Sequence, residues 1–168
     1  MSIQVTGRVA TKADHALFER FTCTSDDGPD YEQFVQRYIR AEEIRHVSTL
    51  DSLRSNHRLL AVFDGDQMVA IGCHRRGALQ NERRFVCAAV RQDHQGRTFS
   101  NGERASDVLW AVIGNDIFDR HDDNIVVVSA RVHPGNERSL GFCRRIGLTP
   151  TELDSSGLLI CSGALEGS

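Results

Sequence analysis

The sequence predicts one α/β domain built on a mixed sheet. Segments with strand patterns and segments with helix patterns alternate along the 168 residues, as they do in sheets covered by helices. No repeat, low-complexity tract or Pro/Gly/Ser-rich linker divides them. The length suits one ordinary domain with its own core. We therefore expect residues 1–168 to form a single domain.

In the first half of the chain, apolar periodicity predicts a strand, two helices and a hairpin. Apolar residues lie at helical spacing in both helices, and Asp-Gly is a common signal for a short hairpin turn. The expected elements are a strand at 3–10, a helix opened by a Thr11/Asp14 capping box and ending near Cys23, a helix from Tyr31 to about Val47, and two strands within 57–76 joined at Asp64-Gly65.

The second half predicts three further strands and two helices. Segment 83–90 is rich in β-formers, and a capping box at Ser100 and Glu103 precedes apolar residues at helical spacing. The elements expected after it are a helix from about Ser100 past Ile117, a strand at 124–132, a helix at 136–146 closed by Gly147, a small strand near 149–153 and a last strand at 158–162.

Composition argues against several classes of protein. The net charge is -3 without a basic block, which disfavours a nucleic-acid surface. No apolar run is long enough for a membrane span, and the N-terminus lacks signal-peptide features, so we expect a cytoplasmic protein without a membrane partner. The five cysteines are scattered and the histidines isolated, so we expect neither a disulfide framework nor a metal site. Nineteen arginines against one lysine suggest a GC-rich genome. We expect a bacterial protein. A homodimer stays open.

A candidate phosphate site lies between the strand ending at Val90 and the helix that follows. The segment from Gln95 to Gly102 is polar, contains glycine and hydroxyl groups, and leads into a helix. The first turn of a helix has unpaired N–H groups and a partial positive charge, which bind phosphate. An ordinary strand-to-helix loop explains the same residues, so both interpretations stay open.

Here the chain resembles the GNAT superfamily of N-acyltransferases, over about residues 57–163. The family's signature is a strand ending in Val followed, a few residues later, by [Q/R]-x-x-G-x-[G/A]. Counted from Val90, Gln95 takes the Q/R position; counted back from the helix, Arg97 to Gly102 fits instead, with Ser100 replacing the first glycine. Either register lacks at least one glycine, which makes the loop degenerate.

A second resemblance covers the later family motif, a strand followed by N-x-x-A-x-x-x-Y-x-x-x-G-F. Asn136 takes the asparagine position, Ser139 the small residue, Gly147 the glycine and Leu148 the Phe position, with the spacing kept. Cys143 stands where the family usually has tyrosine.

The resemblance implies a fold and a cosubstrate. The fold would be a mostly antiparallel sheet of about six or seven strands, with helices on both faces and a V-shaped splay between the fourth and fifth strands. The cosubstrate would be acetyl-CoA or another acyl-CoA. The residues implied in binding it are Ala88, Ala89 and Val90 for the pantetheine arm, Gln95, Gly96, Arg97, Thr98, Phe99, Ser100, Asn101 and Gly102 for the pyrophosphate, and Asn136 and Cys143.

The resemblance also implies direct attack of an amine on the thioester. Cys143 is then the candidate acid in place of tyrosine, and Glu82 the candidate base. Each has a structural alternative, a small buried residue and a surface carboxylate. His74 and His133 are candidates on pKa alone, although each is more often a surface histidine. Tyr31, Phe34 and Tyr38 either line the acceptor groove or belong to the core.

Three functions therefore compete. The first is an N-acetyltransferase acting on an amine acceptor. The second is a degenerate module that binds acyl-CoA or a partner protein without catalysis. The third rests on Phe21-Thr22-Cys23 ahead of an aromatic helix, which resembles GNAT-type toxins that acetylate charged tRNA. The acidic balance counts against the third.

Overall fold

The computed structural model describes residues 5–43, 45, 57–120 and 125–166. Its strands are β1 (Val5–Val9), β2 (His57–Asp64), β3 (Gln67–Arg76), β4 (Glu82–Val90), β5 (Ile125–Val132), β6 (Thr149–Leu153) and β7 (Leu159–Glu166). Its helices are η1 (Lys12–Asp14), α1 (His15–Glu19), α2 (Asp30–Tyr38), η2 (Ile39–Glu43), η4 (Gln92–His94), α4 (Ala105–Arg120) and α5 (Glu137–Arg145). The predicted order of elements is confirmed, including the small strand β6.

One seven-stranded sheet carries the whole fold, in the order β1-β2-β3-β4-β5-β7-β6. Every neighbouring pair is antiparallel except β4 and β5, which run parallel. The β2–β3 hairpin turns at Gly65, whose φ of 61° lies in the left-handed region that glycine accepts. The predicted mixed, mostly antiparallel sheet is therefore confirmed.

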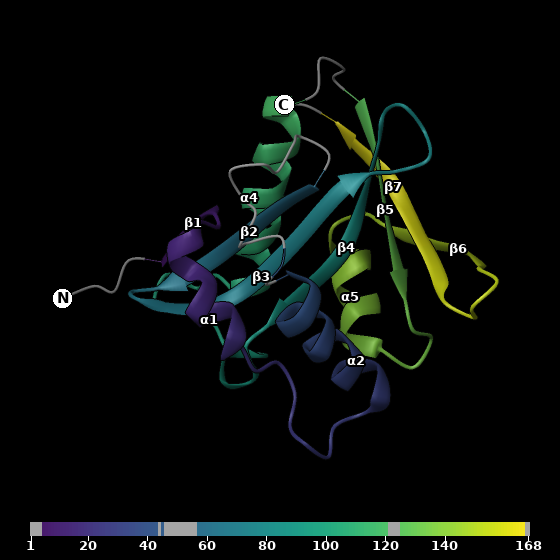
Figure 1. Ribbon diagram of the computed structural model, residues 1–168. Helices are drawn as coiled ribbons and strands as arrows, with labels where there is room; N and C mark the ends of the chain where they lie inside the picture. Colours follow the sequence, from purple (N-terminus) through teal and green to yellow (C-terminus); the bar gives the residue numbers. More distant parts are fainter. Residues whose placement is uncertain (1–4, 44, 46–56, 121–124, 167–168) are drawn as a thin grey trace.

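Helices cover both faces of this sheet (Figure 1). α4 and α5 pack on one face, where the apolar stripe Leu109, Ile113 and Ile117 of α4 is buried. α1, α2 and η2 cover the other face through a second apolar cluster that includes Phe18 and Ile39. α4 lies so close to β3 that a side chain at Gly72 would come within 2.6 Å of Ile113 Cδ1.

The structure corrects two predicted helix ends. α4 begins at Ala105 and not near Ser100, because Phe99–Gly102 closes a turn of its own in which Gly102 N–H donates to Phe99 O. Glu103, expected to cap Ser100, binds Asn101 instead. α1 ends at Glu19, short of Cys23. Residues 44 and 46–56, where the second helix was expected to end, lie outside the described part of the chain.

A charged network is buried between α4 and the sheet. Asp116 of α4 accepts two hydrogen bonds from the Arg58 guanidinium, at 2.8 and 3.2 Å, and its Oδ2 lies 2.9 Å from His74 Nε2. His74 Nδ1 accepts from Arg83, so the ring is neutral with its proton on Nε2. His74 is 0% exposed, which shows that the predicted surface position was wrong.

Acidification is expected to destabilise the fold through His74. Burial, followed by the nearby charges of Arg83 and Arg58, lowers the pKa of His74 against the opposing bond to Asp116. Below its ordinary pKa of about 6.5, the unfolded chain therefore binds more protons than the folded one. The free energy of unfolding therefore decreases as the pH is lowered, by at most about 1.4 kcal/mol per pH unit for one group. Urea unfolding at pH 7.5 and 5.5 measures this.

The control variant is His74→Gln, because glutamine can donate to Asp116 and accept from Arg83 without titrating. It should flatten the pH dependence between pH 7.5 and 5.5. A slope that stays as steep in the variant would assign the effect to other groups.

Candidate active site

The central feature of the site is a splay between β4 and β5. The two strands pair at only four positions, from Glu82 opposite Val127 to Phe85 opposite Ala130. β4 continues to Val90 and β5 to Val132 without further pairing between them, and they diverge toward their carboxyl ends (Figure 1). The predicted V-shaped gap in the sheet is present.

The unpaired half of β4 directs its backbone into this gap. On the β3 side, Arg91 N–H donates to Val69 O at 2.8 Å. Antiparallel pairing alternates, so the neighbouring residues Ala88 and Val90 turn their N–H and C=O groups toward the splay. Ala88 is solvent-exposed although it lies in the middle strand of seven. Backbone groups at the centre of a sheet are thus open to a ligand.

The segment that connects β4 to α4 lies at the open end of the splay. η4 follows β4, Gly96 and Gly102 have φ of 71° and 85°, and Thr98 pairs with Arg104 in an isolated bridge. A side chain built at either glycine would meet no atom within 4 Å, so both backbones face open space. Ala105, the first residue of α4, lies beside this bridge. The N–H groups of Asp107 and Val108 already donate to Arg104 O, so a ligand at this helix start would meet the N–H groups that precede them.

A cleft of about 440 Å³ lies at the carboxyl end of β4. Three walls form it: the loop between α1 and α2, the turn after β4, and the start of α5. The lining residues are Cys23, Thr24, Ser25, Gly28, Pro29, Tyr31, Glu32, Gln92, Gln95, Gly135, Asn136, Glu137 and Arg138. The cleft thus lies at the end of β4 that is not paired with β5.

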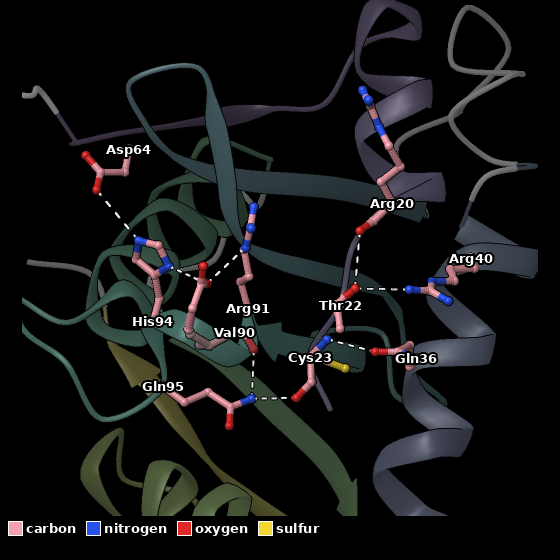
Figure 2. Close-up of polar contacts among 11 residues, drawn as sticks. Arg20, Thr22, Cys23, Gln36, Arg40, Asp64, Val90, Arg91, His94 and Gln95 are labelled. Atoms are coloured by element: carbon pink, nitrogen blue, oxygen red, sulfur yellow. Dashed lines mark hydrogen bonds and ion pairs between the residues drawn. The ribbon is translucent and has the colours of Figure 1, made fainter. Parts of the chain in front are cut away.

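Gln95 joins these three walls with one side chain. Its Nε2 donates to Val90 O at 2.9 Å and to Cys23 O at 2.6 Å, and both bonds are drawn in Figure 2. Its Oε1 accepts from Arg138 of α5. Gln95 was predicted to bind pyrophosphate, but in this structure its side-chain amide hydrogen-bonds to the protein.

The loop before α2 is held against the same turn (Figure 2). Gln92 N–H donates to Thr22 O at 2.9 Å, and the Thr22 hydroxyl accepts from Arg40. Gln36, which is buried, accepts from the N–H groups of Cys23 and Thr24. The wall of the cleft opposite α5 is therefore fixed to both α2 and the end of β4.

Asn136 and Cys143, the two site residues predicted from the later motif, cap a helix and pack in the core, respectively. Asn136 caps α5, where its Oδ1 accepts from Ser139 N–H at 3.1 Å, and it lines the cleft. Cys143 is 4% exposed, and burial, with the neighbouring Cys161 thiol, raises the pKa of Cys143 to about 12. A thiol with this pKa is a weak proton donor to a departing thiolate of ordinary basicity, near 8.5.

Glu82, the predicted base, lies at the closed end of the splay. It is 8% exposed; Oε1 accepts from the Ser129 hydroxyl at 2.5 Å, and Oε2 accepts from the N–H groups of Ala78 and Leu79. Burial alone would raise the pKa of Glu82, but these hydrogen bonds outweigh it and hold the pKa below its ordinary value. The carboxylate ties β4 to β5 and closes the turn after β3.

The variant Glu82→Gln separates this contact role from the predicted base role. The amide nitrogen of glutamine cannot accept the bonds that one carboxylate oxygen takes, so we expect a loss of about 1–3 kcal/mol in unfolding free energy. We expect kcat to stay within tenfold, whereas loss of a general base lowers it by about 10²-fold or more. Denaturation and steady-state kinetics, with Ser129→Ala as control, measure both; a kcat fall of that size with unchanged stability would establish the base.

Of the aromatic residues considered for the acceptor groove, Tyr31 lines the cleft. Its ring stacks on His133 at 4.7 Å between centroids, and its hydroxyl donates to Gly135 O. Phe34 is 62% exposed and stacks on Tyr38, so it belongs neither to the core nor to the cleft.

Sequence reasoning missed Arg138 and the segment from Cys23 to Gly28. Both reach the cleft through contacts across more than forty residues of sequence, such as the bond from Arg138 to Gln95. For the segment from Cys23 to Gly28, the local signals were the polar, glycine-containing break before α2 and the likeness at Phe21-Thr22-Cys23; Arg138 had none. Within the described residues, no three His, Cys, Asp or Glu side chains gather as a metal site, and no helix is long and apolar enough to cross a membrane.

Comparisons with known proteins identify this architecture. No protein-family model and no curated protein matches the sequence. Among solved structures, the chain is similar to the PaiA N-acetyltransferase from Thermoplasma acidophilum in complex with coenzyme A, with a TM-score of 0.69 at 10% identity, covering 95% of this chain and 98% of that one.

Two more solved structures show the same likeness. An acetyltransferase from Thermus thermophilus gives a TM-score of 0.68 at 19% identity, covering 98% and 100% of the two chains. The ribosomal-protein-S18-alanine N-acetyltransferase from Escherichia coli gives 0.62 at 11% identity, covering 98% and 96%. The chain therefore has the fold of the GNAT N-acetyltransferases, and the predicted fold is confirmed.

Proposed function

We propose that this protein is an acyl-CoA-dependent N-acyltransferase that transfers an acetyl or other acyl group to an amine. The observation that carries the proposal is the splay, which leaves Ala88 exposed and unpaired toward β5 in the middle of the sheet. A central strand that is open on one edge presents unpaired backbone N–H and C=O groups, and an extended ligand that carries amide groups can pair with them. The pantetheine arm of CoA is such a partner.

The residues present fit this cosubstrate. The backbone groups of Ala88 and Val90 would pair with the pantetheine amides. The open glycine positions 96 and 102 and the start of α4 would receive the diphosphate, because helix N-termini favour anions. The PaiA protein, which has the same fold, was solved in complex with coenzyme A, which supports an acyl-CoA as the cosubstrate. Acetyl-CoA is the first acyl donor to test.

In the reaction proposed, the amine nitrogen bonds to the acyl carbon and the carbon–sulfur bond breaks. The sulfur leaves with the bonding electron pair as a thiolate, which takes up a proton, and the amine nitrogen loses one. The chain's contribution is to hold the thioester in the splay and the amine in the cleft, since positioning two reactants lowers the barrier by itself. Both protons can pass through water at this open site.

Incubation with acetyl-CoA and a panel of amines, with release of free thiol as the readout, tests the proposal. Turnover that depends on an amine supports it. Binding of CoA without turnover on any amine would favour a non-catalytic acyl-CoA-binding module. If CoA at millimolar concentration does not bind at all, the proposal is wrong.

A further inference from the structure

The Gln95 side chain occupies a backbone group that the proposed cosubstrate needs. Val90 C=O is turned toward the splay by the alternation of β4, and Gln95 Nε2 donates to it at 2.9 Å. The donor is a primary amide, so its N–H is the same chemical group that a pantetheine amide would offer. The carbonyl therefore already has an amide partner of the chain itself.

The two other bonds of Gln95 close the mouth of the cleft around this contact. The second N–H reaches Cys23 O at 2.6 Å, on the loop before α2, and the oxygen accepts from Arg138 at the start of α5. Donors and acceptor of the amide are all used. The side chain thus bridges the walls between which a ligand of the splay must pass.

We propose that Gln95 is an internal plug of the splay, and that acyl-CoA displaces its amide from Val90 O when it binds, because the amide stands between this carbonyl and the wall at Cys23. The proposal rests on the proposed function, because the competing ligand is the pantetheine arm. Displacement also breaks the bond to Cys23 O and frees the oxygen that Arg138 holds. Binding of the cosubstrate therefore removes this bridge between the two walls of the cleft, while Gln36 and the Gln92 N–H still hold the loop before α2.

The variant Gln95→Ala tests the plug, because the direction of its effect distinguishes two roles. If Gln95 competes with the ligand, removing it strengthens binding of CoA by about 3- to 10-fold, the range of one net hydrogen bond. If Gln95 is a ligand of the pyrophosphate, as the sequence predicted, removing it weakens binding. Calorimetric titration with CoA measures the dissociation constant directly.

Two further measurements complete the test. Pantetheine, which lacks the diphosphate, should gain affinity by a similar factor, because the competition is at Val90 O. Without ligand, Gln95→Ala should unfold at a lower temperature than the natural protein, since it loses the bridge. Stability and affinity would then change in opposite directions. Gln92→Ala, an exposed glutamine in the same cleft, is the matched control and should change the affinity less than twofold.

The outcomes are separable from those of the proposed function. If the natural protein does not bind CoA, the proposed function fails and the plug with it. If it binds CoA while Gln95→Ala binds equally well or more weakly, the plug alone is overturned. Tighter binding of both CoA and pantetheine by Gln95→Ala, but not by Gln92→Ala, establishes it.

Discussion

Asp116→Asn is expected to lower the free energy of unfolding by about 3–5 kcal/mol, as is typical when one partner of a buried charge pair is removed. Asp116 is 10% exposed at its side chain and Arg58 14%. Burial alone would raise the pKa of Asp116, but the hydrogen bonds from His74 and Arg58 and the charge of Arg58 hold it below its ordinary value. An amide supplies no charge for this guanidinium. Urea unfolding at pH 7.5 measures the loss.

The matched control lies on the same helix. Asp107 pairs with Arg145 at 3.2 Å, and both side chains are more than 40% exposed. Because exposed pairs contribute little, Asp107→Asn should cost less than about 1 kcal/mol. The double variant Arg58→Met/Asp116→Asn should recover part of the loss, since methionine needs no counter-charge and the amide oxygen can still accept from His74. A cost for Asp116→Asn as small as that for Asp107→Asn would show that the network contributes little to stability.

Local patterns in the sequence predicted the elements well, because each rests on neighbouring residues. The spacing of apolar residues placed α4, Asp64-Gly65 marked the β2–β3 turn, and β6 was predicted at its observed bounds. The start of α4 was predicted wrongly because the sequence allows Glu103 to hydrogen-bond to either of two nearby residues. It can cap Ser100 or bind Asn101, and the turn closed by Gly102 decides for the second.

The candidate site was predicted only in part, because its chemistry depends on contacts between distant segments. The splay between β4 and β5 was implied by family resemblance and not by any pattern of residues. The roles of Glu82 and Gln95 are set by Ser129 and Arg138, which lie more than forty residues away. A single sequence shows that such side chains are polar, but not which partners satisfy them.

Ala88→Trp is expected to weaken CoA binding by at least about 100-fold while the fold is kept. Ala88 is exposed on the unpaired half of β4, so an indole there would meet little protein. It would cover the backbone stretch that faces the splay, and one tryptophan side chain is large enough to exclude a ligand from a narrow gap. Calorimetric titration with CoA, together with the melting temperature, measures both parts of the prediction.

The matched control is Ala164→Trp, because Ala164 is also an exposed alanine in the sheet, but pairs with Val127 at the closed end of the splay. It should leave the affinity for CoA within about twofold. Equal loss in both variants would point to a general disturbance of the sheet. Full binding by Ala88→Trp would mean that the cosubstrate does not lie along β4, and the proposed function would lose the observation that carries it.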